Sequence, residues 1–320
     1  MRQEKILITG ASGQLGSVLT EQLQLKWGSN NVIATDLRDN KHFNGHFEML
    51  DATDFDTLKT LVLKYNITQI YHLAAILSAN GEKYPLNTWD INMKTFFNVL
   101  EVSRLHKVNK VFFPSSIAVF GADAPKINTP QDYVLAPSTV YGISKVAGEN
   151  WAKYYFERYN LDVRSLRYPG VIGHQSLPGG GTTDYAVDIF HKAVNHEKFE
   201  CFLNADTALP MIYMDDAIRA TIELMDAPKE NITVRTSYNL SGMSFSPEQL
   251  ANPIKNIYPE FEICYKPDFR QEIAESWPSS IDDSAARLDW NWKPKYNIDS
   301  MTNTMVEELN IKYKMETLIS

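Results

Sequence analysis

The chain has 320 residues, of which 44% are hydrophobic and 22% charged, the balance of an ordinary globular protein with room for a large core. Its 31 basic and 39 acidic residues leave a formal net charge of −8, which excludes nucleic acids and anionic membranes as partners. Cys201 and Cys264 form no CxxC pair, which excludes a disulfide framework and favours a cytoplasmic location. We expect no signal peptide and no membrane span, because no apolar run is long enough for either.

Short apolar runs alternate with segments of helical periodicity through the first half of the chain. We predict strands at 5–9, 31–35, 47–50, 69–73, 110–114 and 162–167. We predict helices between them at 14–26, 54–65, 89–106 and 140–159. This alternation predicts an α/β fold of the Rossmann type, with a doubly wound parallel sheet that binds its ligand at the carboxyl ends of the strands.

The pattern becomes looser after about residue 170, where glycine and proline gather at 178–181. Helices are predicted at 185–194 and 215–225, and the remainder contains short Pro- and Trp-rich stretches. We therefore predict a cofactor-binding Rossmann domain at 1–170, rejoined by roughly 206–240. A smaller substrate-binding region is predicted at roughly 171–205 and 241–320.

A glycine motif, Gly10–Gly16, follows the first predicted strand and opens the first predicted helix. Glycines permit a tight turn and let the backbone approach a pyrophosphate, while the helix N-terminus supplies free N–H groups. The spacing is GxxGxxG rather than GxGxxG, so a plain glycine turn is the alternative. The predicted cofactor contacts in this motif are Gly10, Ser12, Gly13, Gln14, Leu15 and Gly16.

Asp36 closes the second predicted strand, 20 residues after Gly16. A carboxylate at this place accepts hydrogen bonds from ribose hydroxyls and repels a 2′-phosphate, which favours NAD over NADP. Arg38 favours NADP instead, because an arginine can bind the 2′-phosphate. Leu37 is predicted to lie beside the same adenosine half of the cofactor.

Further cofactor contacts are predicted at the ends of the third and fourth strands. Asp51, with Ala52 next to it, could hydrogen-bond the adenine, or could simply belong to the cap of the following helix. Small residues at Leu73-Ala74-Ala75 would let the nicotinamide half lie against backbone, although core packing explains them equally well.

Tyr141 and Lys145 are four residues apart in a predicted helix and therefore share one face. Of the 16 tyrosines, only Tyr141 has a lysine at this spacing. A tyrosine with a pKa near 7 needs roughly 4 kcal/mol of preference for phenolate, which an ammonium about 4 Å away can supply. Tyr141 is the predicted general base, and Lys145 lowers its pKa.

Ser115 and Ser116 end the fifth predicted strand, where a side chain would face a ligand. A hydroxyl there can orient the substrate oxygen toward Tyr141, and a turn or capping role is the alternative. We predict that Ser116 is catalytic and that both serines contact the substrate.

Taken together, these motifs resemble those of the extended short-chain dehydrogenases/reductases, and the resemblance covers nearly the whole chain. It also includes Asn92 and the segment Arg167–Gly170. The resemblance implies that the lysine holds the nicotinamide ribose and that Asn92 supports this lysine through the backbone and water. It also implies a cofactor contact for Tyr168 and a homodimer formed by the helices that carry Tyr141 and Lys145.

Two segments, 77–82 and 178–185, are similar to the short-chain type of L-threonine 3-dehydrogenases. This resemblance implies NAD-dependent oxidation of L-threonine at C3 to 2-amino-3-oxobutanoate. It implies substrate contacts from Ser78, Gly181, Thr182 and Thr183, although plain turns are the alternative for both segments.

Two other functions stay open. Nucleotide-sugar epimerases and dehydratases use the same serine, tyrosine and lysine, but many of them resemble one another in an Asn after the sixth strand, which is absent from Arg167–Gly170. A catalytically silent NAD-binding protein is disfavoured by the complete set of Ser116, Tyr141 and Lys145. No HExxH motif or Cys/His cluster is present, so we predict no metal site.

Overall fold

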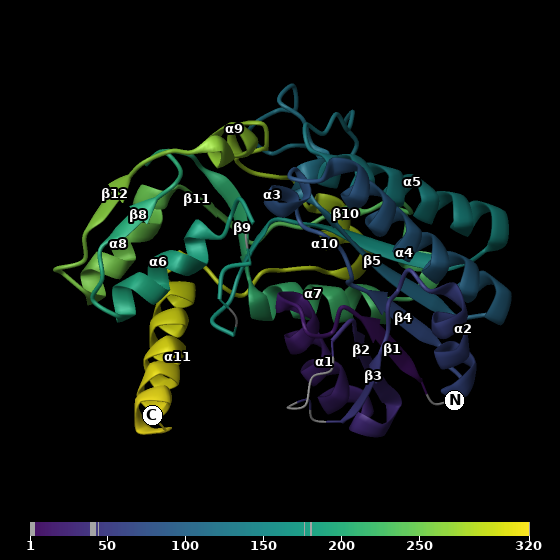
Figure 1. Ribbon diagram of the computed structural model, residues 1–320. Coiled ribbons are helices and arrows are strands. Elements are labelled where there is room, and N and C mark those ends of the chain that lie inside the picture. The colour runs from purple at the N-terminus through teal and green to yellow at the C-terminus, as the bar shows by residue number, and fades with distance from the viewer. Residues whose placement is uncertain (1–3, 39–42, 44, 176, 180, 320) are drawn as a thin grey trace.

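The computed structural model describes residues 4–38, 43, 45–175, 177–179 and 181–319. Its larger part, on the right in Figure 1, is built on a seven-stranded sheet with the strand order β10-β6-β5-β4-β1-β2-β3. Each neighbouring pair in this sheet is parallel. The strands are β1 (Ile6–Thr9), β2 (Val32–Asp36), β3 (His46–Met49), β4 (Gln69–His72), β5 (Lys110–Ser116), β6 (Asp162–Tyr168) and β10 (Tyr238–Asn239).

Helices cover both faces of this sheet, which explains why its strands read as continuous apolar runs. On one face, α1 (Gln14–Trp27) and α7 (Met214–Asp226) pack in one hydrophobic cluster with strands β1 and β2. On the other face, α2 (Phe55–Lys64), α4 (Pro85–His106) and α5 (Val140–Tyr159) form a second cluster. The predicted Rossmann-type fold is confirmed.

A smaller part lies on the left in Figure 1 and has its own hydrophobic cluster. It contains a three-stranded sheet, β11-β9-β7, and a two-stranded sheet, β12-β8. Its elements are β7 (Gly170–Ile172), α6 (Tyr185–Val194), β8 (Phe199–Cys201), β9 (Leu209–Tyr213), β11 (Met243–Phe245), α8 (Pro247–Ile257), β12 (Ile263–Tyr265), α9 (Phe269–Glu275) and α11 (Ile298–Ile319). The remaining short helices are α3 (Ser78–Gly81) and α10 (Ser284–Trp290), with 3-10 turns η1 (Ser29–Asn31), η2 (Ile117–Val119) and η3 (Lys229–Asn231).

The last third of the chain passes between the larger and the smaller part more often than the predicted domain boundaries imply. Strand β10 joins the large sheet, whereas β9 belongs to the three-stranded sheet. Trp290 and Trp292, from the region predicted to cover the substrate, pack in the cluster of α1 and α7. The predicted domain boundaries stay a prediction.

The parallel strands β1, β4, β5 and β6 all end at the same edge of the large sheet, as parallel pairing requires. The glycine loop follows β1, and Ser116 ends β5. This edge faces the smaller part, so a ligand bound there contacts both. Within the described ranges, no helix is long and apolar enough to cross a membrane.

Candidate active site

The glycine loop is packed so closely that Gly10 and Gly16 have no room for a side chain. Gly10 has a φ of +75°, in the left-handed region that favours glycine, and a Cβ there would lie 2.7 Å from the backbone nitrogen of Ala74. A Cβ on Gly16 would overlap the carbonyl oxygen of Gly10. The loop therefore presents bare backbone and the N-terminus of α1 to the pocket, which fits a pyrophosphate.

The carboxylate of Asp36 lies beside this loop. Its Oδ2 accepts a hydrogen bond from the backbone nitrogen of Ser12 at 2.9 Å, and its Oδ1 accepts one from Leu37 at 2.7 Å. Each carboxylate oxygen keeps a further lone pair, so the group is fixed in place and can still accept bonds from ribose hydroxyls. Together with the glycine loop, Asp36 fits an adenine dinucleotide.

Asp51 is exposed and closes the turn that precedes α2. Its Oδ1 accepts a hydrogen bond from the backbone of Thr53 at 2.8 Å, and Asp54, not Asp51, caps the helix. Ala52 is buried, and its carbonyl oxygen accepts a hydrogen bond from Asn98 at 2.9 Å. Adenine contacts at Asp51 and Ala52 stay a prediction.

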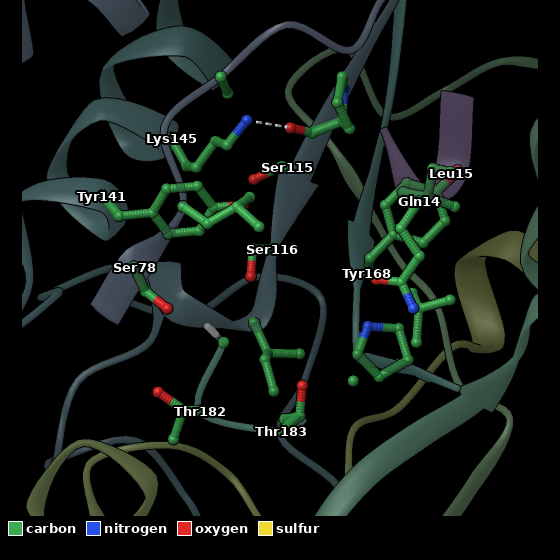
Figure 2. A pocket seen from close by; sticks show the side chains of 18 of the residues that line it. Gln14, Leu15, Ser78, Ser115, Ser116, Tyr141, Lys145, Tyr168, Thr182 and Thr183 are labelled. Atoms are coloured by element: carbon green, nitrogen blue, oxygen red, sulfur yellow. Dashed lines mark hydrogen bonds between the residues drawn. The ribbon is translucent and has the colours of Figure 1, made fainter. Parts of the chain in front are cut away.

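One pocket of about 250 Å³ lies at the carboxyl edge of the sheet. Figure 2 shows its lining side chains, with Ser78, Tyr141 and Lys145 on one flank and Gln14 and Leu15 on the other. It brings together these predicted site residues: Gly10, Gly13, Gln14, Leu15, Gly16, Leu73, Ala75, Ser78, Ser115, Ser116, Tyr141, Lys145, Tyr168, Gly181, Thr182 and Thr183. The predicted residues that do not line it are Ser12, Asp36, Leu37, Asp51, Ala52, Ala74 and Asn92.

Tyr141 lies in the first turn of α5, opposite the end of β5. Burial raises the pKa of its hydroxyl to about 12, and a hydrogen bond with Ser116 opposes that rise. The Ser116 hydroxyl also accepts a hydrogen bond from the backbone of Ala118 at 3.2 Å. At neutral pH, Tyr141 is therefore a neutral phenol that is directed at Ser116.

Lys145 is almost fully buried, and its Nζ donates a hydrogen bond of 2.7 Å to the carbonyl oxygen of Pro114. The same atom lies 4.7 Å from the ring centre of Phe113 and 5.2 Å from that of Tyr141. Burial lowers the pKa of Lys145 to about 7, against an opposing effect of the negative charge of Glu149. The amine can thus change its protonation state at neutral pH.

Asn92 lies behind this lysine and fixes the chain after β4. Its side chain accepts a hydrogen bond from the backbone nitrogen of Ile76 at 2.8 Å and donates one to the Ile76 oxygen at 3.1 Å. A cavity of about 10 Å³, which is about the room that one water needs, lies between Asn92, Ser144 and Lys145. A supporting role for Asn92 thus fits the structure.

The two adjacent serines have different partners. The hydroxyl of Ser115 donates a hydrogen bond of 2.6 Å to Oε1 of Glu149, which is fully buried. Ser116 faces Tyr141 instead. The structure therefore brings both serines to the pocket but directs the Ser115 proton into the protein, and a substrate contact by Ser115 stays a prediction.

The segments predicted to contact the substrate meet on the side of the smaller part. Ser78 begins α3 and is buried, as is Thr182, whose hydroxyl has no hydrogen-bond partner among the described residues. The backbone nitrogen of Gly181 donates a hydrogen bond of 2.7 Å to Asp184. Gly180 of the same segment lies outside the described residues.

Sequence reasoning missed two polar residues of this pocket, Asp184 and Trp277. Trp277 is buried, and its indole nitrogen has no hydrogen-bond partner among the described residues. It lies 100 positions or more from most of the other lining residues, so no local pattern could place it there. Asp184 lies in the 178–185 segment, which resemblance had already assigned to the substrate. Its negative charge could have marked it as a pocket residue.

The position of Asp36 generates a prediction about cofactor choice. Asp36→Ala removes the negative charge that opposes a 2′-phosphate, so the ratio of kcat/KM with NAD to that with NADP should fall by about tenfold or more. Steady-state kinetics with both cofactors measure this ratio. An unchanged ratio would show that Asp36 does not select the cofactor.

The depressed pKa of Lys145 generates a prediction about stability. Between about pH 7 and pH 10 the unfolded chain binds more protons than the folded protein, so the free energy of unfolding should rise with pH over that window. Lys145→Met removes this cost and should stabilise the protein at pH 7 by about 2–4 kcal/mol, with a gain that shrinks toward pH 10. Denaturant titrations at several pH values test this, with the exposed Lys153→Met as control. A gain that is independent of pH would contradict it.

Comparison with known proteins supports this arrangement. Residues 6–241 match the family described as the NAD dependent epimerase/dehydratase family. An uncharacterised epimerase/dehydratase of Staphylococcus saprophyticus is 46% identical over 318 residues, which are 98% of this chain and 99% of that protein.

Solved structures are similar over nearly the whole chain. The holo form of a GalE-like L-threonine dehydrogenase from Cupriavidus necator is 54% identical with a TM-score of 0.94, over 95% of this chain and 99% of that one. A monomeric L-threonine 3-dehydrogenase from a metagenome, in its apo form, is 48% identical with a TM-score of 0.93, over 96% and 99%. These relatives support an NAD-dependent oxidoreductase whose cofactor is NAD, and the chain belongs to the NAD-dependent epimerase/dehydratase family of extended short-chain dehydrogenases/reductases.

Proposed function

We propose that the protein oxidises the C3 hydroxyl of L-threonine to 2-amino-3-oxobutanoate. The observation that carries this proposal is a single pocket of about 250 Å³ that joins the Ser116, Tyr141 and Lys145 group to small polar residues of the 178–185 segment. The similarity to two L-threonine dehydrogenases, at 54% and 48% identity, supports it.

In this proposal, the Ser116 hydroxyl orients the substrate oxygen, and Tyr141 in its phenolate form takes the hydroxyl proton on its phenolic oxygen. NAD, when bound, would supply the oxidant for this reaction, as the acceptor of the hydride from C3. With a pKa of about 12, the Tyr141 hydroxyl is almost entirely protonated at neutral pH, so very little phenolate is available to act as a base. We infer that the charge of Lys145 must act on this phenol during turnover, besides holding the nicotinamide ribose.

The rest of the pocket suits a small zwitterion. The hydroxyls of Ser78, Thr182 and Thr183 and the backbone of Gly181 are polar without being cationic. Hydroxyl and backbone groups can bind an ammonium and a carboxylate separately, without a fixed arginine. A pocket that hydrogen-bonds such groups discriminates against analogues that lack them, because its own groups would be left unpaired.

The rival function is epimerisation or dehydration of a nucleotide-sugar, and the relative from Staphylococcus saprophyticus is described as an uncharacterised epimerase/dehydratase. It uses the same Ser116, Tyr141 and Lys145 but retains NAD, so it yields no net NADH. Addition of L-threonine and NAD should therefore produce NADH under our proposal, whereas 2-butanol, which lacks both charged groups, should produce almost none. Absence of NADH with L-threonine, together with calorimetric binding of UDP-glucose, would favour the rival.

The role of Tyr141 predicts the effect of Tyr141→Phe, which keeps the ring and removes the hydroxyl. Turnover of L-threonine should fall by at least about 100-fold, since general acid–base catalysis contributes at least this much. Binding of NAD, followed by fluorescence titration, should change little. Tyr155→Phe is the matched control, because Tyr155 lies at the far end of α5 and its hydroxyl donates a hydrogen bond to Glu101 of α4. Near-normal turnover in Tyr141→Phe would reject the assignment.

We further propose that α4 and α5 pair two copies into a homodimer. Trp151 and Tyr154 on α5 are 39% and 46% exposed, and Trp151 packs against Phe97 of α4 at 4.9 Å between ring centres. Exposed aromatic groups of this kind are typical of interfaces. One structural relative is described as monomeric, so the point needs measurement.

The dimer proposal is tested by light scattering coupled to size-exclusion chromatography. The protein should elute with twice the mass of the 36.5 kDa chain, and Trp151→Glu should shift it to the monomer by burying a charge in the interface. Leu288→Glu, at an exposed site on α10, is the control and should remain dimeric. A monomeric unmodified protein would refute the pairing.

A further inference from the structure

A buried ion pair lies directly behind the pocket. Glu149 is fully buried on α5, and Arg167 on β6 is 3% exposed. Arg167 Nε donates to Glu149 Oε1 at 3.0 Å, and its Nη2 donates to Oε2 at 2.8 Å, which makes a two-pronged contact. Two charges are costly to bury even when paired, so this pair adds little net stability by itself.

The pair ties four elements together at the end of β5. Ser115 of β5 donates to Glu149, and Ser115 also pairs with Arg167 in the register of β5 and β6. On its other side, Arg167 donates to the backbone oxygen of Gln131 at 2.9 Å and to Oδ1 of Asn239 on β10 at 3.1 Å. The residue next to Ser115 is Ser116, so the pair fixes the strand end that carries the predicted catalytic serine.

We propose that the Glu149–Arg167 pair is a positioning device for the active site. Through Ser115, it holds Ser116 opposite Tyr141, and Glu149 places a fixed negative charge one helical turn from the Lys145 amine. This proposal rests on the proposed catalytic roles of Ser116, Tyr141 and Lys145. It gives Glu149 and Arg167 no contact with the substrate.

Among the titratable groups that face the Lys145 amine, Glu149 carries the negative charge. The titratable groups that face the amine are Tyr141 and Glu149 on α5 and His72 on β4. Burial and the charge of Lys145 together lower the pKa of His72 to about 3, so this imidazole is neutral. The negative charge of Glu149 raises the pKa of Lys145, in opposition to the lowering effect of burial.

The positioning role is tested by measuring kcat in three variants, which are Ser115→Ala, Glu149→Met/Arg167→Met and the combination of the two. Ser115→Ala removes the hydrogen bond to Glu149, and Glu149→Met/Arg167→Met replaces the ion pair by apolar groups of similar volume. Each should lower kcat for L-threonine about tenfold, and the combined triple variant should fall no further, because both remove the same tie. Ser165→Ala is the matched control, since it removes a buried hydroxyl that bonds Ser237 at 2.9 Å away from the pocket. Unchanged kcat, or losses that multiply in the triple variant, would overturn the role.

The charge effect is tested without substrate, which keeps it independent of the proposed function. In protein labelled with ¹³Cε-lysine, the resonance of Lys145 is the one missing from Lys145→Arg, and its shift with pH gives the pKa. The Glu149→Met/Arg167→Met variant should titrate about half a unit or more below the unmodified protein. An identical titration would overturn the proposal. If L-threonine proves not to be a substrate, the unmodified protein shows no turnover, whereas this titration still decides the charge effect.

Discussion

The burial of the Lys145 amine is the constraint on which the rest of the site depends. Its hydrogen bond to Pro114 at 2.7 Å and the ring of Phe113 at 4.7 Å replace the water that an exposed lysine would have. This replacement is incomplete, so burial lowers the pKa of Lys145 to about 7. A group held in this state costs stability, and active sites are where proteins accept such a cost.

The first turn of α5 delivers Tyr141 to that site by an unusually close backbone contact. Gly142 lies against the carbonyl oxygen of Ala118, in the turn that follows Ser116, and a Cβ on Gly142 would overlap that oxygen. Thr139 caps the helix by accepting a bond from Gly142, and Glu82 accepts one from the backbone of Val140. The glycine after Tyr141 therefore serves close approach, as Gly10 and Gly16 do in the cofactor loop.

Much of the large sheet could be predicted from the sequence because its signals are local. The predicted helix at 140–159 has the bounds of α5, and the strand predicted at 162–167 is β6 with one residue fewer. The glycine loop and the spacing of Tyr141 and Lys145 are equally local. Residues whose roles depend on distant partners were not predicted, such as Trp277, or the two-residue strand β10 that pairs with β6.

The electrostatics of the site show a second limit of sequence reasoning. The spacing of Tyr141 and Lys145 predicted an ammonium that lowers the pKa of the phenol. In the structure, the Lys145 amine donates a hydrogen bond to Pro114, and burial raises the pKa of Tyr141 to about 12. Spacing along a helix defines which side chains share a face of that helix. The direction of a flexible lysine side chain also depends on its hydrogen-bond acceptor, which here is Pro114 on strand β5.

The pocket joins two hydrophobic clusters, and the residues that line it lie on two kinds of segment, regular elements and a loop. Tyr168 belongs to the cluster under the large sheet, whereas Tyr141 and the turn after Ser116 pack against the cluster of the smaller part. The reacting groups sit on strands and helices with fixed hydrogen bonds, while Thr182 sits on a segment between β7 and α6. Rigid elements preserve the geometry that proton transfer needs, and loops can change without disturbing it. Under the proposed function, a substrate that reaches Tyr141 would also meet polar groups such as Thr182, whose hydroxyl has no partner among the described residues.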